Sequence, residues 1–599
     1  MARQCPPASC SRVQQSTRDA YMHPQLKKWA KLLDEHSSRK PHYSVVHNVC
    51  LFSRCKSWKP GNPSNSRRTM LTAWSISRKE GYRRLPTLAC CLPRCLRTID
   101  GVGRLVIVHS KQSHPSQANN DSDYKPAVDE GRYPRKDIHF PDRNQNSHGA
   151  WAWRCIVSSG VTNSGTLAGK TFALKDNVAL KGVPMLLGTN FIKDFVPDCD
   201  ATVATRILEA GGIILGKAVC ENMCHSATSH SSGTGIVENP FAKGYSAGGS
   251  SSGSGVLVAL GEVDGAIGAD QGGSIRVPAA NCGIVGFKPT FGLVPYTGCG
   301  SNEPTNDHLG PMTRTVLENA QFLEAIAGND NIDDRSFAAP RPSSVPAYSS
   351  IANLPVNRPL EGRNIAVITE SLKMPGLDPR VISTFRAAVD RFLELGANVE
   401  EISIPLHSKG AAIWTGVSKV GGFLSKTTGA FGRRGHQMLD LNRLLHPMGQ
   451  ENWDNAYSST KNIYLNGLYA TQKFPLLLSK ATNLSRQLRD AYDDALKRFD
   501  VLLTPTLPYV ATSHAAPNAT PLQQIAKQIG LTSNTAPFNQ SGHPVLALPI
   551  GMLEVLEGPG VAKKVKLPVS MQVIGRWWDE MTVLETAHAW ERANDWKLM

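Results

Sequence analysis

The sequence lacks any long apolar run. No stretch of its 599 residues approaches 18 consecutive apolar side chains, so we expect no transmembrane helix. No secretory apolar segment follows Met1, which favours a reducing, cytoplasmic setting with free thiols. The first 18 residues contain no Asp or Glu, as in a mitochondrial presequence, but they form no apolar helical stripe. A mitochondrial location is therefore the alternative to the cytoplasm.

The sequence also lacks a complete zinc template such as one C-x2-C pair followed by a second. Seven of the 13 cysteines lie in residues 1–110, and none of them forms a C-x2-C pair. Cys220 and Cys224 form a C-x3-C pair beside His225, but no second pair of ligands accompanies them. We therefore expect neither a metal nor a cofactor.

Acidic residues are scarce only near the N-terminus. The net charge is +16, and residues 1–110 hold 20 Lys and Arg against 5 Asp and Glu, whereas the rest of the chain is close to neutral. Beyond one short helix expected over His23–His36, residues 1–110 form a basic Cys-, Arg- and Ser-rich segment, which we expect to be largely disordered. Nucleic-acid binding by this segment is the alternative, and it would weaken steeply with salt.

Residues 111–160 are polar and interrupted by prolines, which predicts a linker. From residue 161 to 599 apolar patterns typical of strands and helices alternate, so we expect one α/β catalytic domain. The predicted strands are Thr171–Leu174, Ile213–Leu215, Asn364–Thr369, Val501–Leu503 and Leu567–Gly575, and the predicted helices are Ala201–Ala210, Thr315–Ala327, Asp378–Leu395 and Asp579–Asn594. Gly244–Thr290 is rich in Gly and Ser, but it contains too many apolar residues for a flexible linker.

Two motifs resemble known functional sequences, a nucleotide-binding P-loop and the nucleophile elbow of hydrolases, but fit neither. Gly211–Lys217 reads G-x4-G-K, but Ala218 follows where a P-loop needs Ser or Thr. Gly249–Gly253 satisfies the G-x-S-x-G pattern of a nucleophile elbow, yet no clear strand leads into it. We therefore expect neither nucleotide binding nor an α/β-hydrolase elbow.

Three other elements point to chemistry. Lys175 ends an apolar strand, Ser250 follows two glycines, and Ser274 lies 24 residues later in the run Asp270–Arg276. A serine hydroxyl becomes a useful nucleophile when a base takes its proton. An uncharged lysine can be that base, and burial favours the uncharged form of lysine. Ser250 could instead cap a helix expected over Ser254–Leu260.

These elements resemble the amidase signature family, which couples a GGSS-type run to a D-x-G-x-S-[LIVM]-R-x-P run. Asp270–Pro278 matches the second run, and the similarity extends from about residue 162 to the C-terminus. Pro304–Val316 and Phe499–Ala511 look most like amidases associated with nitrile metabolism, which hydrolyse short aliphatic and aromatic primary amides. The resemblance implies a mixed central β-sheet with helices on both faces.

The resemblance also assigns roles. Ser274 would be the nucleophile and Lys175 the base, and Ser250, after a cis peptide bond, would relay the proton between them. The backbone N–H groups of Gln271, Gly272, Gly273 and Ser274 would bind the oxyanion. Supporting roles fall to Ser251, Asp270 and Arg276, with Asp270 and Arg276 expected to pair.

The expected partner is therefore a small-molecule amide, with neither a membrane nor nucleic acid. Two alternative functions remain: the glutaminase component of a glutamyl-tRNA amidotransferase, which hands ammonia to a partner, or a nucleic-acid-binding protein with an idle amidase core. The resemblance allows a homodimer, although residues 1–110 do not resemble the helical region that the relatives use for dimer contacts.

Overall fold

Twelve strands in one mixed sheet organise the part of the chain that the computed structural model describes, residues 132–160, 164–428 and 433–599. The described residues all belong to one unit. The predictions for residues 1–110, including the helix over His23–His36, lie outside them. The helices of the described residues include none that is long and apolar enough to cross a membrane.

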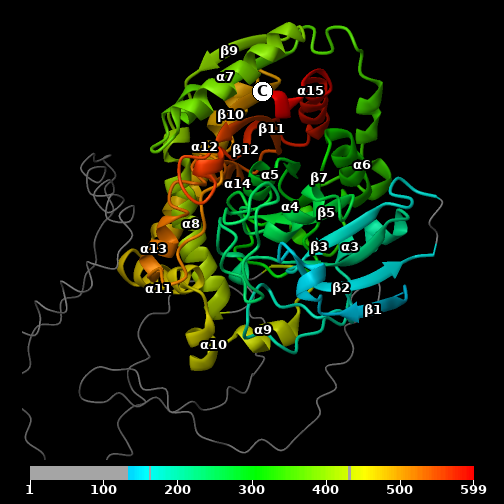
Figure 1. Cartoon of the computed structure of the whole chain (residues 1–599), viewed down its shortest axis with the longest axis vertical. Coiled ribbons are helices and arrows are strands. Elements are labelled where there is room, and N and C mark those ends of the chain that lie inside the picture. The colour runs from blue at the N-terminus through cyan, green and yellow to red at the C-terminus, as the bar shows by residue number, and fades with distance from the viewer. Residues whose placement is uncertain (1–131, 161–163, 429–432) are drawn as a thin grey trace, which may run out of the picture. The chain divides into compact units, whose positions relative to one another are not determined.

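The strands are β1 Arg135–His139, β2 Trp151–Ser158, β3 Thr171–Lys175, β4 Ile213–Ala218, β5 Gly265–Asp270, β6 Val285–Lys288, β7 His308–Thr313, β8 Asn364–Ile368, β9 Asn398–Ile402, β10 Val501–Pro505, β11 Val545–Glu554 and β12 Lys566–Ile574. Their order across the sheet is β1-β2-β4-β3-β5-β7-β6-β11-β12-β10-β8-β9. Figure 1 shows the two edge strands, β1 and β9, at opposite ends of the sheet.

The α-helices of the described residues are α3 Thr202–Glu209, α4 Ser252–Ala259, α5 Arg276–Cys282, α6 Val316–Ile326, α7 Pro379–Glu394, α8 His407–Thr428, α9 Leu439–Leu445, α10 Gln450–Asn455, α11 Ser458–Lys473, α12 Leu477–Leu496, α13 Pro521–Ala526, α14 Ala536–Ser541 and α15 Glu580–Ala593. Each predicted strand and helix from residue 161 onward is present, with ends that differ by a few residues.

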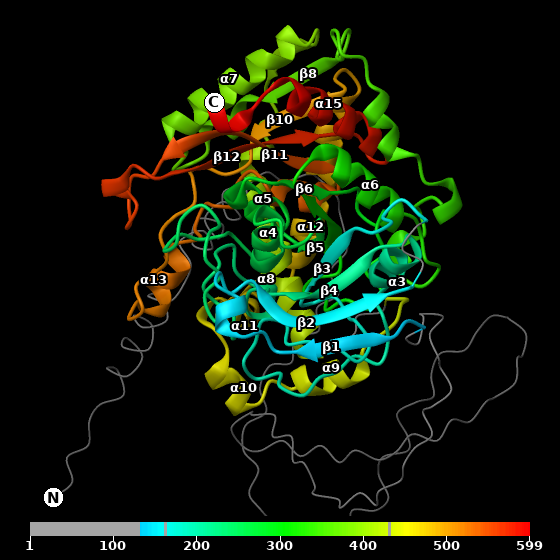
Figure 2. The same cartoon turned by 45° about the vertical axis from the view of Figure 1, so that its right-hand side comes forward.

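Helices cover both faces of the sheet because neighbouring strand residues point to opposite sides. Val501 and Leu503 of β10 pack into the core beneath α3, α6, α7 and α15, whereas Leu502 packs with residues of α8, α12 and α14. In β3 the side chain of Ala173 faces the opposite way from its neighbours and packs with α4 and α5. Figure 2 shows α6 and α15 beside the sheet and α8 behind it. The predicted α/β class and its two helical layers are confirmed.

The linker predicted over residues 111–160 is wrong in its described half. β1 and β2 lie there, and β2 pairs with both β1 and β4. The side chains of Trp151 and Val157 are fully buried, so this segment is part of the core. The sequence pattern does not predict β1, because four of its five residues are exposed and the strand therefore has no apolar face. Such exposure is common for an edge strand.

Candidate active site

Lys175 lies at the end of β3, one of two neighbouring parallel strands of the sheet. β3 and β5 run side by side, with Leu174 opposite Ile267. Parallel strands end at the same edge of a sheet, where α/β proteins commonly bind their ligands. Lys175 is the last residue of β3, and its Nζ atom donates to the carbonyl of Ala269 near the end of β5 at 3.1 Å.

Lys175 and Ser250 are in direct contact. Lys175 Nζ lies 2.8 Å from Ser250 Oγ, and both side chains are buried from solvent. The N-cap of α4 is Ser251, not Ser250, so the alternative capping role of Ser250 is wrong. Ser251 Oγ instead bonds to both backbone groups of Ala269, at 3.3 and 3.2 Å, and thereby attaches the serine loop to β5.

The loop before Ser250 leaves no space for side chains. A Cβ atom on Gly249 would come within 2.6 Å of the Ser226 carbonyl oxygen, and Gly248 has a positive φ of 77°. The Gly249–Ser250 peptide bond is cis, as the resemblance implied. Both glycines are therefore required by close contacts in the loop.

A buried carboxylate that the sequence analysis missed supports the same loop. Glu221 accepts hydrogen bonds from Ser252 Oγ at 2.8 Å and from the N–H and hydroxyl of Ser231 at 2.8 and 2.6 Å. Its own N–H donates to the Ser250 carbonyl at 3.1 Å. Burial raises the pKa of Glu221 to about 7, although these hydrogen bonds oppose the rise.

Asp270 and Arg276 form the expected ion pair and hold the second serine loop. Arg276 Nε and Nη2 each donate to the Asp270 carboxylate at 3.0 Å, and both side chains are fully buried. Burial would raise the pKa of Asp270, but the charge and hydrogen bonds of Arg276 hold it well below its usual range. The remaining donors of Arg276 bind Thr535 O, Gln572 Oε1 and Asn539 Oδ1.

The predicted set of oxyanion donors needs one correction. The N–H of Gly273 donates to Asp270 Oδ1 at 2.6 Å, so it is not free to bind a substrate. The N–H groups of Gln271, Gly272 and Ser274 donate to no other described residue. These three residues line a cavity, which Gly273 does not.

Ser274 opens onto this cavity, whose volume is about 150 Å³. We call it the acyl cavity. Successive turns of α8 and of α11 line the acyl cavity, because residues three and four apart share a helix face. The contributing residues are Ala411, Trp414, Thr415, Ser418 and Lys419 of α8 and Ser459, Asn462, Ile463 and Asn466 of α11.

The two serine loops touch through their backbones. The Ser251 N–H donates to the Ser274 carbonyl oxygen at 3.3 Å. Between the hydroxyls of Ser250 and Ser274, the described part of the chain contains no hydrogen bond. The geometry therefore includes the first link of the predicted relay, from Lys175 to Ser250, and leaves the second open.

The misleading motif at Gly211–Lys217 has a structural explanation. Lys217 lies in β4, and its buried Nζ pairs with the buried carboxylate of Asp176 at 3.3 Å. Lys217 is therefore paired with a carboxylate inside the protein. The residues form a strand where a P-loop would form a turn, so the motif is coincidental.

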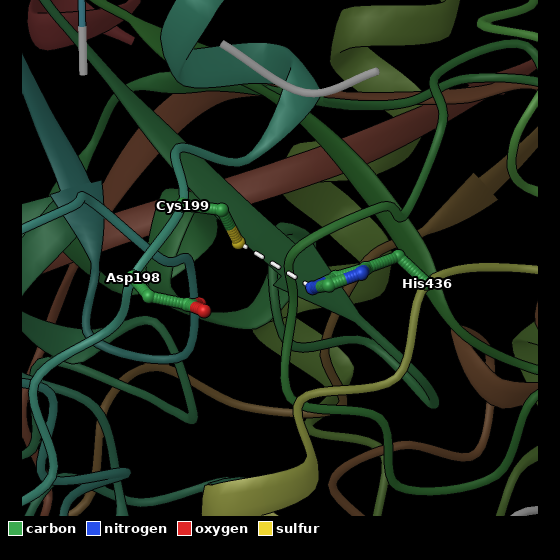
Figure 3. A group of neighbouring side chains, drawn as sticks. All are labelled: Asp198, Cys199 and His436. Atoms are coloured by element: carbon green, nitrogen blue, oxygen red, sulfur yellow. Dashed lines mark hydrogen bonds between the residues drawn. The ribbon is translucent and has the colours of Figure 1, made fainter. Parts of the chain in front are cut away.

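One group of side chains in the described residues has the composition of a metal site. Asp198, Cys199 and His436 point toward one another (Figure 3), and Cys199 Sγ lies 3.5 Å from His436 Nε2. His436 lines a second cavity of about 140 Å³, which shares Cys224 with the acyl cavity. Structural zinc sites use four ligands, and this group has three. None of its members lines the acyl cavity.

Comparison with known proteins identifies the family. The Amidase family model matches residues 157–584. The chain is 38% identical to an enantioselective amidase of Rhodococcus rhodochrous, over 78% of this chain and 88% of that protein. The chain belongs to the amidase signature family. It is therefore an enzyme, an amidase that hydrolyses amide C–N bonds.

Two further relatives show the breadth of this family. One is a component of the glutamyl-tRNA(Gln) amidotransferase of Synechococcus sp. (strain RCC307), which is 32% identical over 72% of this chain and 84% of that one. A solved bacterial aryl acylamidase of the amidase signature family has a TM-score of 0.59 and 25% identity, covering 72% of this chain and 84% of the other.

Proposed function

We propose that the enzyme hydrolyses small aliphatic or aromatic carboxylic amides through an acyl-Ser274 intermediate. Lys175, buried and 2.8 Å from Ser250 Oγ, carries the proposal, because a lysine without an acidic partner can take a proton from a neighbouring hydroxyl. Ser274, which is partly buried, supplies the hydroxyl at the acyl cavity. Ser250 would connect the two through a hydrogen bond that forms in the reacting complex, as is common for catalytic hydrogen bonds.

In the first half of the reaction, Ser274 Oγ attacks the amide carbonyl carbon. Its proton passes to Ser250, and the Ser250 proton passes to the uncharged Lys175. The tetrahedral oxyanion is bound by the free N–H groups of Gln271, Gly272 and Ser274. The C–N bond then breaks, and the proton returns through Ser250 to the leaving nitrogen, which departs as ammonia.

In the second half, water attacks the acyl ester and loses its proton along the same path. The bond between the acyl carbon and Ser274 Oγ breaks, the carboxylic acid leaves, and the proton returns to Ser274. Removing one oxyanion donor typically costs about 2.7–4 kcal/mol of transition-state stabilisation. The fully buried pair of Asp270 and Arg276 would keep the loop that supplies these donors in place.

Replacement of the nucleophile tests the proposal. Ser274→Ala should lower the hydrolysis of propionamide and benzamide by about 10⁴-fold or more, and Lys175→Ala should do nearly the same. Ser408→Ala, on the exposed side of α8, is the control and should keep full activity. Mass spectrometry of the wild type should detect an acyl group on Ser274. Unchanged activity in folded Ser274→Ala would refute the mechanism.

Transfer of ammonia from glutamine is the second candidate, because a relative named as part of an amidotransferase is 32% identical. Glutamine carries an α-ammonium group, and the described residues that line the acyl cavity include no Asp or Glu to pair with it. We therefore favour a stand-alone amidase. A glutaminase assay with and without the amidotransferase partner proteins separates the two: activity that appears only with the partners would favour the second candidate.

A further inference from the structure

Lys419 is a cationic residue of the acyl cavity that the proposed reaction does not use. Its side chain lines the cavity together with Ser274. Among the described residues it has no hydrogen-bond or ion-pair partner. Burial lowers its pKa to about 8, so most Lys419 side chains are charged at neutral pH. A positive charge inside a cavity is costly unless a negative charge pairs with it, so we expect the ligand to carry an anion.

Several other polar groups of the same cavity are also unpaired. Gln271 Nε2, Ser459 Oγ and His225 Nε2 are buried and have no hydrogen-bond partner among the residues that the structure describes, and all three residues line the cavity. Ser459 is only 3% exposed. Buried polar groups are rarely left without partners, so their concentration at one cavity indicates a ligand with several acceptor atoms.

Apolar side chains form another part of the cavity wall, among further polar ones. Ile463 of α11 and Ile525 and Ile529 at and beyond α13 supply aliphatic surface, and Trp414 adds an aromatic ring. The Trp414 ring packs against the backbone of Gly272, where a Cβ atom would lie 2.5 Å from it, and its Nε1 donates to the Gln271 carbonyl at 2.6 Å. Trp414 therefore fixes the position of α8 relative to the Ser274 loop.

The rise along α8 indicates how far the reacting amide and the anionic end of the ligand lie from each other. Lys419 follows Trp414 by five residues, which is about 7.5 Å along the axis of α8. An anion at Lys419 would thus be separated from the reacting carbonyl by an apolar spacer of several carbon atoms. The cavity lining has a cation and no described carboxylate, so it suits a negatively charged ligand better than a zwitterion such as an amino acid.

We infer that the substrate is the monoamide of a dicarboxylic acid, whose free carboxylate binds Lys419 while its amide reaches Ser274. This inference rests on the proposed function and names its substrate class. Lys419 is then a specificity residue, since it touches the substrate away from the reacting atoms. Ser459 and the Gln271 amide would donate to the same carboxylate.

Matched substrates test the inference. With 4-carbamoylbenzoate and its neutral analogue 4-methylbenzamide, the wild type should show a kcat/KM about 10- to 100-fold higher for the acidic amide, the range expected for one buried charged hydrogen bond. Lys419→Met should remove this preference, chiefly by raising KM for 4-carbamoylbenzoate. Lys409→Met, the same change at an exposed position of α8, should keep the preference.

The outcomes separate this inference from the proposed function. Ser274-dependent hydrolysis of both amides at equal rates, or a preference that survives Lys419→Met, would overturn the assignment of Lys419 and leave the amidase mechanism standing. Hydrolysis that persists in Ser274→Ala would instead overturn the mechanism. Glutamine serves as the zwitterionic probe, and a kcat/KM for glutamine equal to that for 4-carbamoylbenzoate would also contradict the inference.

Discussion

Gly249 carries no reactive group, but its position has no space for a side chain. It lies between Gly248 and Ser250, and carbonyl oxygens of Ser226 and Thr228 approach the position of its missing Cβ atom to 2.6 and 2.9 Å. A methyl group there must displace backbone, because neither obstacle is the end of a flexible side chain. The position of Ser250 therefore depends on the absence of a side chain at its neighbour.

Gly249→Ala should lower kcat for benzamide by about 100-fold, because displacements of about 1 Å in a catalytic group cost this much. The control is Gly449→Ala, where no atom lies within 4 Å of the added carbon. Steady-state kinetics on both variants, with circular dichroism to verify folding, make the comparison. A fully active Gly249→Ala would mean that the loop tolerates displacement.

Elements far apart in the sequence meet at Arg276, the first residue of α5. Its guanidinium binds Asp270 at the end of β5, residues on either side of the start of α14, and Gln572 of β12. Asn539 of α14 also donates to Asp270 Oδ1 at 2.8 Å. One buried cation thus connects four elements around the Ser274 loop.

Arg276→Met should destabilise the protein by about 3–5 kcal/mol, because it leaves the Asp270 charge buried without its partner. Urea unfolding followed by tryptophan fluorescence measures the change. Arg486→Met removes an exposed partner of Asp490 and should cost less than about 1 kcal/mol. Equal losses in the two variants would show that the buried pair contributes no more than a surface pair.

At the scale of elements, the sequence predicts what depends on local pattern. The apolar run that ends in Lys175 and the runs over Asn364–Thr369 and Val501–Leu503 predict strands, because buried strands need apolar side chains. β1 is not predicted in this way, since its exposed edge position allows a polar sequence. Nor could the pattern place Trp414 and Lys419 at the cavity, because the side of α8 that faces Ser274 is decided by packing against α11 and α12.

The same limit applies to the site. The match to the family runs predicted that Lys175 meets Ser250, and their Nζ and Oγ atoms lie 2.8 Å apart. The donation from Gly273 N–H to Asp270 depends on the exact turn of one loop, and no residue type at 273 signals it. Glu221 was missed because a single glutamate in a polar segment has no distinctive pattern.

Across the whole molecule, buried carboxyl groups link stability to pH. Burial raises the pKa of Glu221 and of Glu303 to about 7, well above the value of about 4.3 expected in an unfolded chain. Between these values the folded protein holds protons that the unfolded chain has lost. Each group therefore stabilises the fold fully below the unfolded pKa, and this contribution is lost as the pH rises through the folded pKa.

Glu221→Gln isolates one such group. The free energy of unfolding of the wild type, minus that of the variant, should be larger at pH 5 than at pH 8, by on the order of 3 kcal/mol. The buried histidines titrate in both proteins and cancel in this difference. Urea unfolding at a series of pH values provides the measurement, and a difference that does not change with pH would contradict the raised pKa.

The long-range contacts of Arg276 also have a consequence during protein synthesis. Lys175, Ser250 and Ser274 are made well before Thr535, Asn539 and Gln572, which hold the Ser274 loop through Arg276. A chain that ends before Thr535 would have every reactive side chain but would lack all three of these partners of Arg276. Activity should therefore begin only after α14 and β12 have been made.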